Sequence, residues 1–397
     1  MMKIFMFIAI FLSLVGCNTD NSINQYEGPI FEGGLYLIED ASLIGTLESL
    51  PPIPYLVDQQ IFNRDSNELI LRFTIIDLIT GDIMGIREFN SKYSFFRAWV
   101  LENDNFAINL YNRNTDEVYL YIFNNAMEEL GVIELNAYTF WSMGFSYLQI
   151  KGNDFYLYGI ELETNEEWTP RPILNPTRLN LLTGEKEVIF EVFEPIQSIH
   201  GFINEKEVFA TERIVLFEQG ILKTRYGLLN LEDEVLIVFD KENFGYGRID
   251  IGFQKVLIAE GTSVGPLLLN EVILFDISDT KSFSVTLATT TSERTSESVW
   301  ARLSYNEDYI VTINDDFSVF RKYDFDGNII IEKNIIIPMT IQDDEQFTVE
   351  ELANGYFRNI FDIIPITEQV YIIHTKSFLE FFGWYVSEHH FQTVVLP

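Results

Sequence analysis

The sequence predicts an all-β protein, a β-propeller with seven four-stranded blades, and three observations lead to that fold class. Few segments have apolar residues at helical spacing; runs of four to eight aliphatic or aromatic residues recur instead, bounded by Asn, Asp, Gly and Glu. One hairpin pattern repeats along the chain. The composition, 47% hydrophobic and 15% aromatic, supplies a large core that Phe dominates. Eight blades or six are the alternatives.

The repeated hairpin consists of an apolar strand, an Asp or Asn, a tight polar turn and a second apolar strand. The copies align at Asp77, Phe123, Asn180, Asn230, Asp276, Asp324 and Tyr385, of which the second and the last are the weakest. Successive copies are separated by roughly 46 to 61 residues. A unit of about 45 to 55 residues with four short strands is one propeller blade.

The stretch between two hairpins supplies the other two strands of a blade. Residues 95–101 and 106–111 read as strands that flank a polar turn, and residues 357–364 and 369–374 repeat that order. One short helix is expected at 348–351, where the spacing fits a capping box.

Near the N-terminus, residues 34–38 and 44–47 are expected to form a further strand pair. They predict either half of an eighth blade or a strand that closes the ring, because an open sheet edge favours aggregation.

Two of the turns contain a Thr-Gly pair, in Leu78-Ile79-Thr80-Gly81-Asp82 and in Leu181-Leu182-Thr183-Gly184-Glu185. They resemble the D-x-x-T-G turn of PQQ-type and TolB-like propeller repeats. The Trp that this family places a few residues later is missing, since Ile86 and Ile189-Phe190 occupy that region. The resemblance therefore supports the architecture and implies no activity.

Residues 1–16 predict a signal peptide, because Lys3 precedes an apolar run that is too short to span a bilayer. The segment Leu14-Val15-Gly16-Cys17 resembles the lipobox of bacterial lipoproteins. This resemblance implies cleavage before Cys17, acylation of its thiol and attachment to a membrane. The expected location is the bacterial cell envelope, on the exported side; which membrane holds the anchor stays open.

Residues 17–34 are polar and contain Gly, which is typical of a flexible tether, and 35–397 make up the propeller domain. Cys17 is the only Cys in the chain, so no internal disulfide is possible and stability must come from packing.

The chain has 26 Lys and Arg against 60 Asp and Glu, a formal net charge of −34. Nucleic-acid binding is excluded as a function class because it needs clustered cations, and the same charge opposes unaided binding to anionic lipids. We expect a monomer without a cofactor, held at the membrane by its lipid.

The strongest candidate for a binding loop surrounds Trp168, which follows Glu166-Glu167 in a long excursion between strands. An aromatic side chain on such a loop suits a protein, peptide or glycan partner. The alternative is a Trp packed over the rim of a blade.

Asp324, Asp326 and Asn328 alternate as ligands of calcium loops do, but the Gly is misplaced and no Glu closes the loop. A hairpin turn explains the same residues. No other metal site is expected.

No catalytic set is complete in the sequence. The segment 261–265 fits G-x-S-x-G, but a strand-like run follows it where a nucleophile elbow needs a helix. His200, His374, His389 and His390 are expected at the surface, the last two in a hairpin turn. The sequence therefore favours a non-catalytic binding or scaffold protein. The alternatives are an envelope hydrolase or lyase that uses carboxylates in the central funnel, and an outer-membrane assembly factor.

Overall fold

The computed structural model confirms an all-β protein with the β-propeller fold. The described residues form strands β1 to β27 in seven sheets, and they include no helix. None of them belongs to a helix that could cross a membrane. The structure describes residues 35–38, 51–63, 68–90, 92–101, 104–135, 147–151, 154–162, 174–180, 182–183, 185–188, 196–203, 206–216, 221–230, 235–243, 246–252, 254–261, 271–277, 281–287, 299–314, 319–335, 356–381 and 384–397.

We number the sheets in chain order. Sheet 1 contains β2 (Pro54–Asn63), β3 (Glu68–Asp77) and β4 (Ile83–Phe89). Sheet 2 contains β5 (Tyr93–Val100), β6 (Phe106–Asn112), β7 (Glu117–Phe123) and β8 (Glu129–Leu135). Sheet 3 contains β9 (Tyr147–Lys151), β10 (Asp154–Leu162), β11 (Leu174–Asn180) and β12 (Lys186–Val188). Sheet 4 contains β13 (Ile196–Phe202), β14 (Glu207–Leu216), β15 (Ile221–Asn230) and β16 (Val235–Asn243). Sheet 5 contains β17 (Tyr246–Ile251), β18 (Lys255–Gly261), β19 (Glu271–Asp276) and β20 (Lys281–Thr286). Sheet 6 contains β21 (Val299–Leu303), β22 (Ile310–Asn314), β23 (Val319–Tyr323) and β24 (Ile329–Asn334). Sheet 7 contains β25 (Tyr356–Pro365), β26 (Val370–Phe381), β27 (Trp384–Val395) and β1 (Leu35–Ile38).

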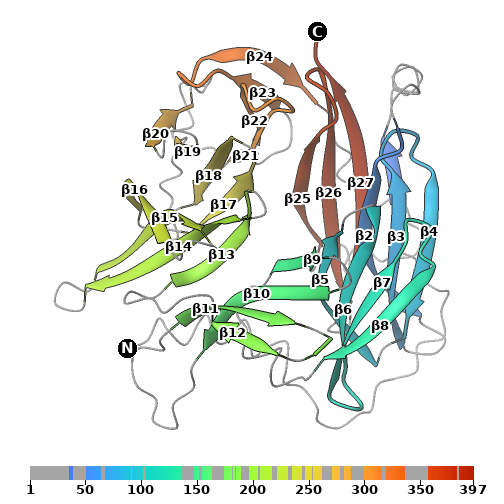
Figure 1. The fold of residues 1–397 in the computed structure, drawn as a ribbon. Helices are drawn as coiled ribbons and strands as arrows, with labels where there is room; N and C mark the ends of the chain where they lie inside the picture. The colour runs from blue at the N-terminus through green and yellow to red at the C-terminus, as the bar shows by residue number, and fades with distance from the viewer. Residues whose placement is uncertain are drawn as a thin grey trace.

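The sheets follow one another around a common centre, as Figure 1 shows. Strands β5, β9, β13, β17, β21 and β25, the first strands of sheets 2 to 7, lie toward the middle, and the last strands of sheets 1 to 6 lie at the periphery. Within each sheet consecutive strands pair antiparallel, which is the meander of a propeller blade. The strands predicted from the sequence at residues 95–101, 106–111, 357–364 and 369–374 are confirmed as β5, β6, β25 and β26.

Sheet 7 joins the two ends of the described chain. Strand β1 pairs with β27 in parallel, and Leu35 lies opposite His389 in the register. The predicted strand at residues 34–38 is confirmed as a member of this last sheet. Its expected partner at 44–47 lies outside the described residues.

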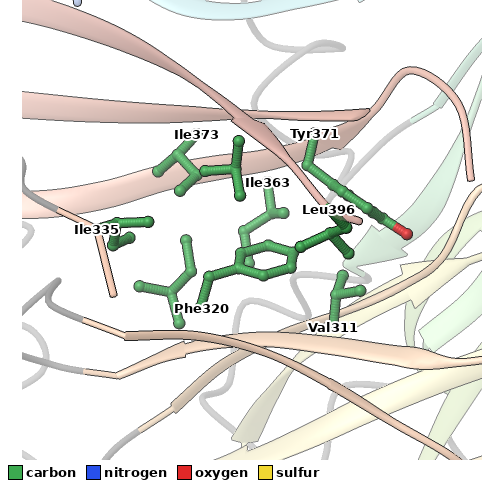
Figure 2. Close-up of a cluster of buried hydrophobic side chains, with 9 residues drawn as sticks. Val311, Phe320, Ile335, Ile363, Tyr371, Ile373 and Leu396 are labelled. Atoms are coloured by element: carbon green, nitrogen blue, oxygen red, sulfur yellow. The ribbon is translucent and has the colours of Figure 1, made fainter. Parts of the chain in front are cut away.

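Apolar side chains fill the space between neighbouring sheets. One cluster joins sheets 1 and 2 around Phe73, Phe89 and Phe123, and others join sheets 4 to 5 and 5 to 6. Figure 2 shows the cluster between sheets 6 and 7, where Phe320 and Tyr371 have ring centroids 5.1 Å apart. A further cluster joins sheet 7 back to sheet 1, so the last sheet packs on the first.

The Asp or Asn of the repeated hairpin accepts hydrogen bonds from the main chain of its own turn. Oδ1 of Asp324 accepts from the N–H groups of Asp326 (3.0 Å) and Asn328 (2.8 Å). Oδ1 of Asn124 accepts in the same way from Ala126 (3.0 Å) and Glu128 (2.9 Å). The repeat therefore marks an Asx turn between two strands.

This geometry corrects two positions in the predicted repeat. In the second copy the turn residue is Asn124, and Phe123 is the buried last residue of β7. In the last copy Tyr385 lies within β27, paired with Glu380, because the hairpin that joins β26 to β27 turns before Trp384. In these two copies the residue aligned with the Asp or Asn of the other copies is aromatic, Phe123 or Tyr385.

In the Thr-Gly turn after β3, the Asp accepts a hydrogen bond from a hydroxyl group as well as from the main chain. Oδ1 of Asp77 accepts from the N–H of Ile79 (2.9 Å), and its Oδ2 accepts from the Thr80 hydroxyl (2.9 Å). The Thr80 hydroxyl in turn accepts from the N–H of Asp82. Gly81 has a φ of 77°, a conformation that favours Gly. The Thr and the Gly thus serve the turn, which is a structural role.

Candidate functional site

The first strands of sheets 5, 6 and 7 are joined by one guanidinium group. Arg302 on β21 donates from Nη1 to Oδ1 of Asp250 on β17, at 2.5 Å, and from Nη2 to Oδ1 of Asp362 on β25. The second oxygen of Asp250 accepts from the N–H of Leu303 at 2.7 Å. Each of the two carboxylates therefore has a defined partner, and the three strands are held together near the middle of the molecule.

Charge balance explains why Arg302 stays ionised although little of its side chain is exposed. Burial disfavours the charge of Arg302, but Asp362 and Asp250 outweigh it and raise the pKa of the guanidinium. The side chains are only 22%, 15% and 20% exposed for Arg302, Asp250 and Asp362. This arrangement, which we call the Arg302 clamp, can fix the three sheets in position.

A second polar cluster lies where sheet 7 packs on sheet 1. The hydroxyl of Tyr55 on β2 lies 3.1 Å from Nδ1 of His374 on β26, and Nε2 of His374 lies 2.8 Å from Nδ1 of His389 on β27. The ring of Phe391 stacks on His374, with centroids 4.3 Å apart. We call this interface, with the groups that cross it, the closing seam.

An ion pair crosses the closing seam beside the histidines. Nζ of Lys376 on β26 lies 2.8 Å from Oδ2 of Asp58 on β2, and the Lys376 side chain is 8% exposed. The Ser387 hydroxyl accepts from the N–H of Gln60 at 3.2 Å. These two polar contacts between β2 and sheet 7 thus pair groups that would otherwise be buried without a partner.

The predicted surface position of His374, His389 and His390 is wrong. All three are at most 1% exposed and lie within long strands. Burial lowers the pKa of His374 well below its ordinary value, and Lys376 and His390 add to the effect. Burial does the same for His389, with further contributions from His374 and Lys376. Both rings are therefore neutral at pH 7.

The opposite face of β27 carries a buried acid. Glu388 is 2% exposed, and its Oε2 lies 3.6 Å from Nε2 of His390, which is 1% exposed. Side chains alternate between the two faces of a strand, so these two point away from the seam that His389 enters.

The candidate residues chosen from the sequence are only partly described. Cys17, Trp168, Glu166 and Glu167 lie outside the described residues, as do Ser263 of the G-x-S-x-G segment and the helix expected at 348–351. Asp324, Asp326 and Asn328 are brought together, but as a turn: Oδ2 of Asp324 accepts from Nδ2 of Asn328 at 3.0 Å. No group of three or more His, Cys, Asp or Glu in the described part of the chain is arranged to hold a metal ion.

Comparison with known proteins gives similar folds and no family. No protein-family model matches the chain, and no curated protein matches it. Among solved structures, the β-propeller domain of the trilobed protease from Pyrococcus furiosus is similar with a TM-score of 0.45 and 10% identity, over 82% of this chain and 92% of that one.

Two further solved structures have comparable similarity. The acylaminoacyl peptidase of Pyrococcus horikoshii has a TM-score of 0.42 and 12% identity; the match covers 72% of this chain and 44% of the peptidase, less than half its length. The WD40 repeats of RRP9 have a TM-score of 0.40 and 9% identity, over 80% and 85% of the two chains. All three scores lie below 0.5, and it is the seven sheets themselves that define the fold.

Proposed function

We propose that this chain is a lipid-anchored β-propeller of the bacterial cell envelope that binds a protein, peptide or glycan partner and catalyses no reaction. The observation that carries the proposal is the Arg302 clamp. A carboxylate-based hydrolase or lyase needs a carboxyl group that can exchange a proton with its substrate. Asp250 and Asp362 are instead bound to Arg302, and Asp250 also to the N–H of Leu303.

The closing seam supports the same reading. Its histidines are buried between two sheets, where no substrate touches them. In this proposal Arg302, Asp250, His374 and His389 hold sheets together, and partner recognition falls to other segments, such as the loop predicted around Trp168 from the sequence.

The anchor is tested by fractionating the full-length protein expressed in a bacterium. The wild-type chain should sediment with membranes, because two or more acyl chains give lasting attachment. Cys17→Ser should move it to the soluble exported fraction, and Ser13→Ala, in the same segment, should leave it in the membrane fraction. A Cys17→Ser protein that still sediments with membranes contradicts the anchor.

Partner binding is tested by crosslinking in intact cells. Trp168→Ala should abolish the crosslinked species that the wild-type chain forms. Tyr305→Ala is the matched control, because Tyr305 is an aromatic side chain with 58% exposure in the turn between β21 and β22. Equal crosslinking by wild type and Trp168→Ala excludes the Trp168 loop as the binding surface.

An envelope hydrolase or lyase is the second candidate, since one Arg and two Asp do converge from three first strands. In that case Asp362→Asn abolishes polysaccharide or peptide cleavage by the purified protein while the fold is retained. Absence of cleavage by the wild-type protein across polysaccharide and peptide libraries removes this candidate.

A further inference from the structure

We propose that the closing seam is sensitive to acid. Sheet 7 stays packed against sheet 1 while His374 and His389 are neutral, and the two sheets separate when these histidines are protonated. The proposal concerns the stability of one interface and does not depend on the proposed function.

The seam joins segments from opposite ends of the sequence. Strand β2 contacts β27, and the apolar cluster here combines residues of sheet 1, such as Val57 and Ile76, with Ile372 and Phe391 of sheet 7. Tyr55 packs edge-on against both His374 and Phe391. A change in the charge of one imidazole therefore acts directly on the contact between the two sheets.

Proton counting gives the hydrogen-bond chain a direction. Nε2 of His389 has no partner at hydrogen-bond geometry among the described residues, yet the main chain of Asp58 favours a proton on this ring. With the proton on Nε2, Nδ1 of His389 accepts from Nε2–H of His374. Nδ1 of His374 then accepts from the Tyr55 hydroxyl. Each neutral ring is thus a donor at one nitrogen and an acceptor at the other.

Further protons reverse this chain and then break it. An imidazolium donates from both nitrogens, so a protonated His374 directs N–H groups at Nδ1 of His389 and at Tyr55, and a protonated His389 directs one at His374. When His374 is protonated, its Nδ1–H faces the Tyr55 hydroxyl, which must turn its own O–H away and accept. When both rings are protonated, Nε2–H of His374 faces Nδ1–H of His389, and that hydrogen bond is lost.

The charged groups that the structure describes around the seam offer no compensation. Lys376 on β26 is the nearby cation, and Asp58 on β2, the acid that faces the seam, is already paired with it. On β25, Asp362 lies opposite His374 in the register but is bound to Arg302. On β27, Glu388 and His390 occupy the other face. Among the residues that the structure describes, a protonated seam therefore holds uncompensated positive charge in a buried interface, which is strongly unfavourable.

The sign of the pH dependence follows from the lowered pKa of both rings. Below the ordinary His value of about 6.5 the opened seam binds more protons than the closed one, so acid favours opening. Each histidine should favour opening by up to about tenfold per pH unit below that value, until the pKa of the closed form is reached.

Hydrogen exchange of the full chain tests the proposal. After correction for intrinsic exchange, protection of peptides from β2, β26 and β27 should fall more than tenfold between pH 7 and pH 5. Peptides from β22 and β23 in sheet 6 should keep their protection. Equal loss of protection in sheet 6 and in the seam overturns the proposal, because it indicates general acid unfolding.

Variants identify the responsible rings. His389→Gln should reduce the pH dependence of exchange at the seam, whereas His200→Gln, on β13 in sheet 4, should leave it unchanged. A seam that keeps the wild-type pH dependence in the double variant His374→Gln, His389→Gln overturns the proposal. If these variants do not fold, NMR titration of the wild-type imidazoles decides: two rings that titrate near pH 6.5 in the closed protein also overturn it.

Discussion

The hydroxyl of Tyr55 lies 3.1 Å from Nδ1 of His374, although 319 positions separate the two residues in the sequence. This hydrogen bond ties the first sheet of the molecule to its last. Tyr55→Phe removes the donor and leaves a buried nitrogen unpaired, so we expect a loss of stability of about 1 to 2 kcal/mol. Urea unfolding at pH 7 measures it.

The control for Tyr55→Phe is Tyr305→Phe, because Tyr305 is 58% exposed. This variant should lie within about 0.5 kcal/mol of the wild type. Equal unfolding midpoints for the two variants contradict the role of Tyr55 in the seam.

The Arg302 clamp predicts a strong effect from a single substitution. Arg302→Ala leaves Asp250 and Asp362 as two partly buried carboxylates without their cation. Removal of one partner of a buried pair costs about 3 to 5 kcal/mol, and the residual exposure of these groups reduces our expectation to about 2 to 3. Arg302→Lys should recover part of the loss, because an ammonium group keeps the charge but not both hydrogen bonds.

A surface pair is the control for the clamp. Arg72 lies 2.7 Å from Glu88, which is 45% exposed, so Arg72→Ala should cost no more than about 1 kcal/mol. Thermal and urea unfolding measure both variants. A cost for Arg302→Ala as small as that for Arg72→Ala means that the clamp contributes little to stability.

Two glycines in neighbouring sheets make a matched pair. A Cβ added to Gly85 on β4 meets the main-chain carbon of Ala126 at 2.4 Å, because the turn between β7 and β8 packs on this strand. A Cβ at Gly131 on β8 meets nothing within 4 Å. Gly85→Ala should destabilise by about 1 to 3 kcal/mol, and Gly131→Ala should be neutral or slightly stabilising. Equal effects on the urea midpoint contradict the packing of that turn.

The repeat and its strands could be predicted from the sequence because both are local signals. Apolar runs between polar turns identified β5 and β6. The Asp or Asn of a hairpin can be recognised in the sequence because it accepts hydrogen bonds from N–H groups of its own turn. The errors at Phe123 and Tyr385 came from copies without that polar residue at the chosen position.

The closing seam could not be predicted because its polar groups find their partners across the fold. His389 and His390 read as a polar turn, but β27 runs from Trp384 to Val395 and buries both rings. Alternation within β27 was the available signal, since Ser387, His389 and Phe391 share one face. The donor that satisfies His374, Tyr55, lies in the first sheet, and no local pattern connects the two.

The turn at Asp324 predicts a stability that depends on acid. Hydrogen bonds from the Asn328 side chain and main chain lower the pKa of the Asp324 carboxyl. A lowered pKa in the folded state means that the carboxylate stabilises the fold at pH values above the ordinary Asp value of about 3.9. This contribution is lost as the pH falls through the pKa of the folded state.

Replacement of Asp324 by Asn keeps the oxygen that accepts the hydrogen bonds of the turn and removes the negative charge. Asn124 and Asn180 bind their turns through an amide oxygen, so Asp324→Asn should keep the turn at pH 7 and remove this part of the acid dependence. Asp324→Ala should lose the turn at both pH values. Urea unfolding at pH 7 and pH 3 measures these variants, with Asp326→Asn as a control because Asp326 is exposed and takes part in the turn through its main-chain N–H. An Asp324→Asn protein with the same acid dependence as the wild type means that other carboxylates govern acid stability.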